Sequence, residues 1–133
     1  MTSASLTEIA RAFLLEMQQC VRSVDYQRAR PLFAEDVIAF GTFATVVAGR
    51  VRLEREQWRN VWPAIREFTF RLDDLHCLGT ADALCVVVPW DSTGLGADGQ
   101  PFRRPGRATL LLVPRDGGWV AAHSHFSLAP TAT

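Results

Sequence analysis

The spacing of the apolar residues changes once along the chain, from a helical period to the alternation of strands. In the first part, apolar side chains recur every three or four residues, as they do on one face of a helix; they are Leu6, Ile9, Ala10, Phe13, Met17, Val21 and Val24. From Glu67 onward, apolar residues alternate with polar ones or form short runs. The chain has 133 residues, the size of a single domain. This order predicts an α+β fold in which three helices cover one face of an antiparallel sheet.

Local signals place the first two helices. Ser5 and Glu8 form a capping-box pattern, in which each side chain caps the backbone N–H of the other, at the start of the first helix. Asp25 is a favourable N-cap for a short second helix that carries Leu32 and Phe33. The sequence therefore predicts two consecutive helices that end before residue 35.

A short extended pair and a third helix complete the first part. The pair is expected at 37–43 and 45–48, because apolar residues there are interrupted by glycine. The third helix is expected at about 53–65, where Trp58 and Trp62 share one stripe. Pro63 should kink or end this helix, since proline removes a backbone donor and clashes with the preceding turn.

The second part predicts a meander of four long strands. They are expected at 67–77, 82–91, 107–114 and 119–128. The segment 92–106 contains four glycines and two prolines, which indicates a long hairpin loop or a flexible sheet edge.

Two of these strands are apolar on both faces, at 83–88 and 108–113. An antiparallel strand with one face in water should instead alternate between apolar and polar residues. The helices can cover only one face of the sheet. We therefore predict a homodimer in which a second copy covers the outer face.

Charge and cysteine content exclude several classes of function. The 14 basic residues balance 14 acidic ones, which argues against a general nucleic-acid binder. All the basic residues are arginine, so Schiff-base and P-loop lysine chemistry are excluded. The three cysteines have no C-x-x-C spacing, and neither a signal peptide nor an apolar run of membrane length is evident. We expect a cytoplasmic protein with reduced cysteines and with neither a nucleic-acid nor a membrane partner.

The tryptophans allow two interpretations. Trp58 and Trp62 are one helical turn apart, and Trp90 ends a strand beside the glycine-rich segment. Core packing is the commoner role, because an aromatic ring buries a large area. The alternative is an aromatic wall at the mouth of a pocket for a flat, apolar ligand. The residues expected to line such a pocket are Phe40, Trp58, Trp62, Trp90, Leu110, Ser124 and Phe126.

Two histidines are the main ionisable candidates. His123 and His125 are two residues apart on an expected strand, so their side chains point to one face. Only dispersed third ligands such as His76 are at hand, and no metal site is predicted. The opposite face of that strand is more apolar and should line the interior, unless a bulge reverses the register; it consists of Val120, Ala122, Ser124, Phe126 and Leu128. In an enzyme, the acid or base candidates are His125, His123 and Asp91.

One basic cluster lies in the glycine-rich segment. Arg103, Arg104 and Arg107 are close in sequence to Asp91 and Asp98, so pairing within the hairpin is expected. The alternative is that the arginines hold an anionic ligand.

Two stretches carry a resemblance to a known family. The first is Leu32-Phe33-Ala34-Glu35-Asp36-Val37 with Gly49. The second runs from Arg107-Ala-Thr through Arg115-Asp-Gly-Gly-Trp119 to His123-Ser-His-Phe-Ser127. With these motifs, the chain resembles the SnoaL-like branch of the nuclear-transport-factor-two-like superfamily and is similar to the calcium/calmodulin-dependent kinase II association domain. The resemblance implies one cone-shaped, cystatin-like domain over residues 1–133, with a pocket inside and dimerisation through the sheet.

The resemblance also identifies positions at which relatives carry functional residues. Steroid isomerases of this fold have a tyrosine on the first helix and an aspartate base on the first strand, and these positions hold Met17 and about Gly41 here. The pocket arginines of the association domain correspond to Leu110 and Phe126.

No complete catalytic set is visible, and no cofactor is predicted. We expect a small homodimer whose aromatic-lined pocket binds a small organic molecule. One alternative, which the resemblance implies, is an isomerase, cyclase or hydrolase of a polyketide-like or terpenoid-like substrate. A further alternative is an oligomerisation module without a ligand.

Overall fold

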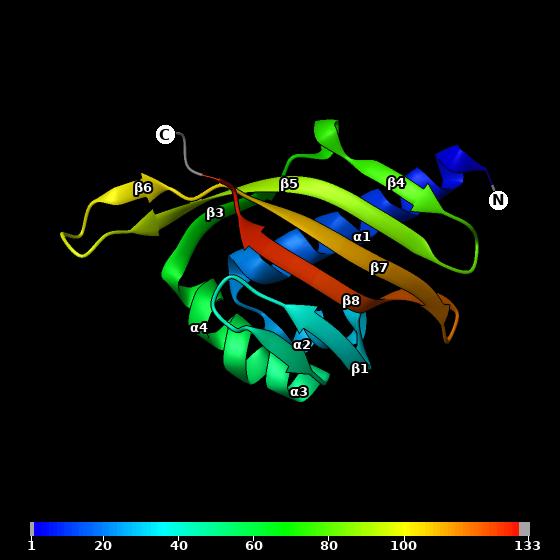
Figure 1. Cartoon of the computed structure of the whole chain (residues 1–133), viewed down its shortest axis with the longest axis horizontal. Coiled ribbons are helices and arrows are strands. Elements are labelled where there is room, and N and C mark those ends of the chain that lie inside the picture. The colour runs from blue at the N-terminus through cyan, green and yellow to red at the C-terminus, as the bar shows by residue number, and fades with distance from the viewer. Residues whose placement is uncertain (1, 131–133) are drawn as a thin grey trace.

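The computed structural model describes residues 2–130. Within this range, helices cover the concave face of a curved, eight-stranded sheet, which confirms the predicted α+β architecture (Figure 1). The helical segments are α1 (Ser3–Ser23), α2 (Tyr26–Ala29), η1 (Arg30–Leu32), α3 (Arg50–Leu53), η2 (Glu54–Trp58), α4 (Arg59–Val61), η3 (Trp62–Ala64) and η4 (Leu72–Asp74). The strands are β1 (Phe33–Phe40), β2 (Val46–Ala48), β3 (Ile65–Phe70), β4 (His76–Gly79), β5 (Leu84–Leu95), β6 (Pro101–Arg103), β7 (Gly106–Arg115) and β8 (Gly118–Leu128).

The long helix α1 packs its apolar face against β3, β4 and β5. It is capped by Thr2, whose hydroxyl accepts the N–H of Ser5 at 3.1 Å, so the capping box that begins at Ser5 is wrong. Asp25 caps α2 as predicted, because its carboxylate accepts the N–H of Arg28 at 3.1 Å. Phe33 is not helical and instead begins β1. None of the described helices is both long and apolar enough to cross a membrane.

The third helix is continuous from residue 50 to residue 61 and contains a π-helical turn, η2. It begins directly after Gly49, about one turn earlier than predicted. Pro63 lies in the short 3₁₀ turn that ends it, which agrees with the predicted stop. Turns of the π type are often found at functional sites, and this one contains Gln57 and Trp58.

The sheet is mixed, and the prediction of a purely antiparallel sheet is wrong. Its main path is β2-β1-β8-β7-β5-β3, with β4 and β6 also paired to β5. β1 and β8 run parallel, with Phe33 opposite Ala121 and Phe40 opposite His125. No turn joins strands that are this far apart in sequence, so local signals do not reveal such a pairing.

Two segments differ from the predicted meander. The expected strand 67–77 is two strands, β3 and β4, which pair with successive parts of β5 and are separated by η4. The segment 92–106 is more ordered than predicted, because β5 continues to Leu95 and β6 folds back on it. These two strands form a hairpin arm that projects from one end of the sheet (Figure 1).

Candidate functional site

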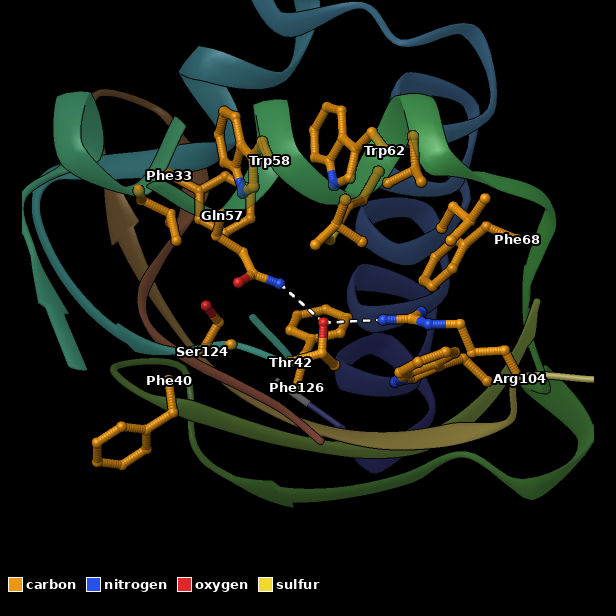
Figure 2. Close-up of a pocket in the computed structure, with 17 residues that line it drawn as sticks. Phe33, Phe40, Thr42, Gln57, Trp58, Trp62, Phe68, Arg104, Ser124 and Phe126 are labelled. Carbon is orange, nitrogen blue, oxygen red and sulfur yellow. Dashed lines mark hydrogen bonds between the residues drawn. The ribbon is translucent and has the colours of Figure 1, made fainter. Parts of the chain in front are cut away.

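A cavity of about 40 Å³ lies between the helices and the concave face of the sheet (Figure 2). Its wall is mainly apolar, and the aromatic side chains in it include Phe33, Trp58, Trp62, Phe68, Trp90 and Phe126. The rings of Trp58 and Trp62 stack with their centroids 4.8 Å apart. Since one water molecule needs roughly 10–15 Å³, the cavity has room for only a few waters.

Four polar side chains converge on this aromatic wall, namely Thr42, Gln57, Arg104 and Ser124. The Thr42 hydroxyl accepts two hydrogen bonds of 3.0 Å each, from Gln57 Nε2 and from Arg104 Nη2 (Figure 2). The amide oxygen of Gln57 accepts the backbone N–H groups of Phe43 and Ala44. Gln57 and Arg104 therefore fix the loop between β1 and β2 beside the cavity.

Arg104 is the cationic residue of the cavity wall. Its guanidinium carbon lies 5.5 Å from the ring centroid of Trp90, and a long contact of 3.5 Å joins Nη1 to Ser92 Oγ. The side chain is half-buried, and this burial lowers its pKa. Among residues 2–130, it has no carboxylate partner.

The other arginines of this cluster point elsewhere. Arg103 pairs with Asp91 at 3.1 Å, as expected for pairing within the hairpin. Arg107 instead donates to Ser127 at 3.4 Å, and Asp98 accepts a backbone N–H of its own turn. The predicted self-pairing of the cluster therefore does not extend to Arg104.

Of the seven residues predicted to line a pocket, six border the cavity, and five of these are Trp58, Trp62, Trp90, Ser124 and Phe126. Phe40 borders it too, but its ring points away and packs on the outer face against His123 and His125 (Figure 2). Leu110 is fully buried in the core and does not contribute to the wall. The prediction is thus wrong for the ring of Phe40 and for Leu110.

Several lining residues were not expected from the sequence. Thr42, Gln57, Phe33 and Phe68 come from segments with no pocket signal of their own. Among these four residues, only Gln57 has a sequence signal, because it is a polar residue beside the tryptophan stripe of its helix. Met17 and Gly41 both border the cavity. The resemblance places the tyrosine of the steroid isomerases at Met17 and their aspartate at about Gly41.

The ionisable candidates lie outside the cavity. His123 is on the outer face, with Nδ1 2.6 Å from the backbone oxygen of Ile38, and His125 is exposed beside it. Asp91 is held by Arg103. No cluster of three or more potential metal ligands forms among the described residues.

A bulge in β8 changes the register that was predicted from the alternation. The pairing shifts between His123 and Ala121, opposite Leu111 and Leu112. Beyond the bulge, Ser124 and Phe126 face the cavity as expected. Before the bulge, Ala121 is the buried residue, in place of the predicted Val120 and Ala122.

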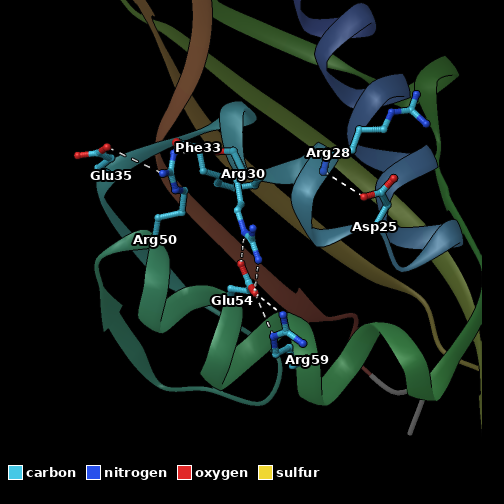
Figure 3. A network of polar contacts seen from close by, with 8 residues as sticks. All are labelled: Asp25, Arg28, Arg30, Phe33, Glu35, Arg50, Glu54 and Arg59. Carbon is cyan, nitrogen blue, oxygen red and sulfur yellow. Dashed lines mark hydrogen bonds and ion pairs between the residues drawn. The ribbon is translucent and has the colours of Figure 1, made fainter.

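The helices that cover the cavity are joined by one carboxylate (Figure 3). Glu54 lies 2.7 Å from both Arg30 and Arg59, and the hydrogen bond from Arg30, followed by that from Arg59, lowers the pKa of Glu54 to about 2. Arg59 also lies over the ring of Tyr26, which stacks on Trp62 with centroids 5.5 Å apart. The charge network is therefore coupled to the aromatic wall.

Solved structures share the whole fold. A nuclear transport factor 2-like superfamily protein from Salmonella enterica has a TM-score of 0.81 at 14% identity, covering 99% of this chain and 96% of its own. A ketosteroid isomerase-like protein from Erwinia carotovora has a TM-score of 0.78 at 15% identity, with 93% and 96% covered. A Xanthomonas campestris protein named for the calcium/calmodulin-dependent protein kinase II association domain has a TM-score of 0.70 at 20% identity, with 92% and 88% covered.

At these identities the likeness establishes the fold, which is nuclear-transport-factor-two-like, also called cystatin-like. No curated protein matches the sequence. The pattern of the SnoaL-like domain family, however, matches residues 10–132, nearly the full length. The chain belongs to the SnoaL-like family.

Proposed function

We propose that the protein binds a small, ring-containing organic molecule in the cavity and does not convert it. The observation that carries the proposal is the composition of the wall, in which six aromatic rings surround a few convergent polar groups. Small-molecule sites typically combine an apolar lining with a few placed polar groups that orient the ligand.

The chemistry of the wall favours binding over catalysis. Proton transfer needs a side chain that can gain and lose a proton near neutral pH. Among the described residues that line the cavity, Arg104 is the only ionisable one, and a guanidinium stays protonated. The resemblance places the tyrosine and the aspartate of the isomerases at Met17 and at about Gly41, and neither of these residues can act as a base.

The cavity must enlarge to take a ligand. Ligand sites usually enclose about 300–1,000 Å³, whereas this one has about 40 Å³. The loop that carries Thr42 is held beside the cavity by hydrogen bonds from Gln57 and Arg104 rather than by a packed core. Breaking these bonds costs far less than opening the helical layer.

The proposal is tested by titrating ¹⁵N-labelled protein with toluene and following the four indole N–H signals. We expect those of Trp58, Trp62 and Trp90 to shift and that of Trp119, which is outside the cavity wall, to remain fixed. Ser124→Leu fills the cavity and should abolish the shifts. Ser127→Leu adds the same side chain to the opposite face of β8 and should preserve them. Equal shifts in both variants, or none in the wild type, would overturn the proposal.

We further propose that the outer face of the sheet is covered by a second copy of the chain. Cross-strand registers place apolar residues and the two histidines in neighbouring rows on this face. The exposed apolar members are Ile38, Phe40, Val46, Leu78 and Val87. Contiguous exposed apolar patches of this kind are typical of interaction surfaces.

Light scattering after size-exclusion chromatography tests the dimer. The wild type should have twice the 14.8 kDa mass of one chain. Phe40→Glu should yield a monomer, because it places a charge on the apolar face, where the Phe40 ring packs against His123 and His125. Phe43→Glu changes an exposed phenylalanine in the loop after β1 and should leave the dimer intact. A monomeric wild type, or a dimeric Phe40→Glu variant, would contradict the proposal.

A further inference from the structure

The half-buried cation at the cavity, Arg104, has no anionic partner in the part of the chain that the structure describes. Its guanidinium donates to the neutral hydroxyl of Thr42 at 3.0 Å and lies over the face of Trp90. The adjacent Arg103, by contrast, is exposed and reaches Asp91. Burying a charge is costly unless it is paired. Arg104 therefore occupies a position at which a bound anion would be stabilised.

Arg104 also stands between two hollows. Together with Thr42 it borders the inner cavity, and the same two residues border an apolar groove of about 240 Å³ on the outside. The lining of the groove also includes exposed aromatic and aliphatic side chains, among them Phe43, Leu95 and Phe102. Val61 and Ile65 border both hollows as well, so the hydrogen bond between Arg104 and Thr42 forms one part of the boundary between groove and cavity.

A second unused donor belongs to the same wall. The indole N–H of Trp90 is buried and has no acceptor among residues 2–130. A buried donor without an acceptor carries a desolvation penalty that an incoming acceptor relieves. Among the described residues, the lining of the cavity contains one guanidinium and no carboxylate.

We infer that the ligand is a ring-bearing monocarboxylate that enters between Thr42 and Arg104, with its ring in the cavity and its carboxylate on the Arg104 guanidinium. The inference rests on the proposed binding function and names its ligand class. A carboxylate matches the fork of a guanidinium and can exchange for the Thr42 hydroxyl. Arg104 is the one cationic side chain among the described residues of the wall, and a single arginine suits a monoanion better than a doubly charged phosphate.

The test compares benzoate with benzamide, its neutral analogue of nearly the same shape. Affinities are measured at pH 7.5 from the indole N–H shifts of the ¹⁵N-labelled protein. We expect the wild type to bind benzoate about 10-fold or more tightly than benzamide, the range for a hydrogen bond to a charged group. Arg104→Met should remove this preference and retain benzamide binding, since it keeps an apolar stem over Trp90.

Two further variants separate charge from side-chain shape. Arg103→Met removes a neighbouring charge that points away from the cavity and should leave the preference unchanged. Arg104→Lys should keep part of the preference for benzoate, because lysine retains the positive charge. Equal binding of benzoate and benzamide by the wild type would overturn the inference while the proposed function stands. If neither probe binds, the inference fails, and the toluene titration decides separately whether the proposed function fails with it.

Discussion

Removal of the Glu54 carboxylate should destabilise the protein at neutral pH and change the acid side of its stability profile. Glu54 joins two arginines from different helical segments, and its side chain is only 12% exposed. Glu54→Gln keeps the shape and removes the charge, so the two guanidinium groups lose their common anion. The expected result is a loss of unfolding free energy that depends on pH.

The magnitude follows from the pKa of Glu54. A folded-state pKa of about 2 against an ordinary value of 4.5 corresponds to about 3 kcal/mol at neutral pH. The side chains of Arg30 and Arg59 are 44% and 51% exposed, so solvent screening reduces this to about 1–2 kcal/mol. Because the folded pKa is lowered, the stabilisation is fully present above pH 4.5 and is lost as the pH falls toward 2.

Urea unfolding at a series of pH values from 7 to 3 measures this difference. The wild type should exceed Glu54→Gln by about 1–2 kcal/mol at pH 7, with a gap that narrows below pH 4.5. Glu56→Gln is the matched control, because Glu56 pairs with Arg52 on the exposed face of the same helix. Glu56→Gln should cost much less than Glu54→Gln, because solvent screens an ion pair between exposed side chains. A gap that is absent at pH 7, or that is unchanged at pH 3, would refute the reasoning.

Three further predictions concern the parts of the structure that hold the cavity and its helices. Gln57→Ala removes three hydrogen bonds and should lower the free energy of unfolding, measured in urea, by about 2–3 kcal/mol. The backbone amides of Phe43 and Ala44 should then exchange their hydrogens faster, and unchanged exchange would contradict the role assigned to Gln57. Asp25→Ala removes the cap of α2 and should cost about 1 kcal/mol, whereas no loss would mean that the cap is dispensable. Cys20 is fully buried, and this burial raises the pKa of its thiol. Iodoacetamide should therefore label Cys20 only as fast as the protein unfolds, and rapid labelling of the native protein would contradict this packing.

Local signals were sufficient for those elements whose partners are near in sequence. The apolar stripe of α1 and the Asp25 cap follow from helix geometry, and the long strands β5, β7 and β8 follow from their apolar runs. The parallel pairing of β1 with β8 joins Phe40 to His125, and no turn records such a distant contact. The break between β3 and β4 was missed because Leu72 continues the alternation while the backbone turns there.

The site was predictable only in its aromatic part. Trp58 and Trp62 share one stripe by helical period, so their common wall follows from the sequence. The ring of Phe40 was misplaced, because it lies on the face of β1 opposite to the buried Val37 and Ala39 and packs against the two histidines. Thr42 and Arg104 come from segments 62 residues apart, so their hydrogen bond depends on the complete fold.

The central claim is that a small organic molecule binds in the cavity between the helices and the sheet. Nuclear Overhauser effects between toluene and ¹³C-labelled protein locate the bound probe directly. The predicted result is a set of contacts from the toluene ring to Trp62 and Phe126. These two residues line opposite sides of the cavity (Figure 2). Contacts only to Phe43 and Phe102 in the outer groove, or none to any residue, would contradict the claim.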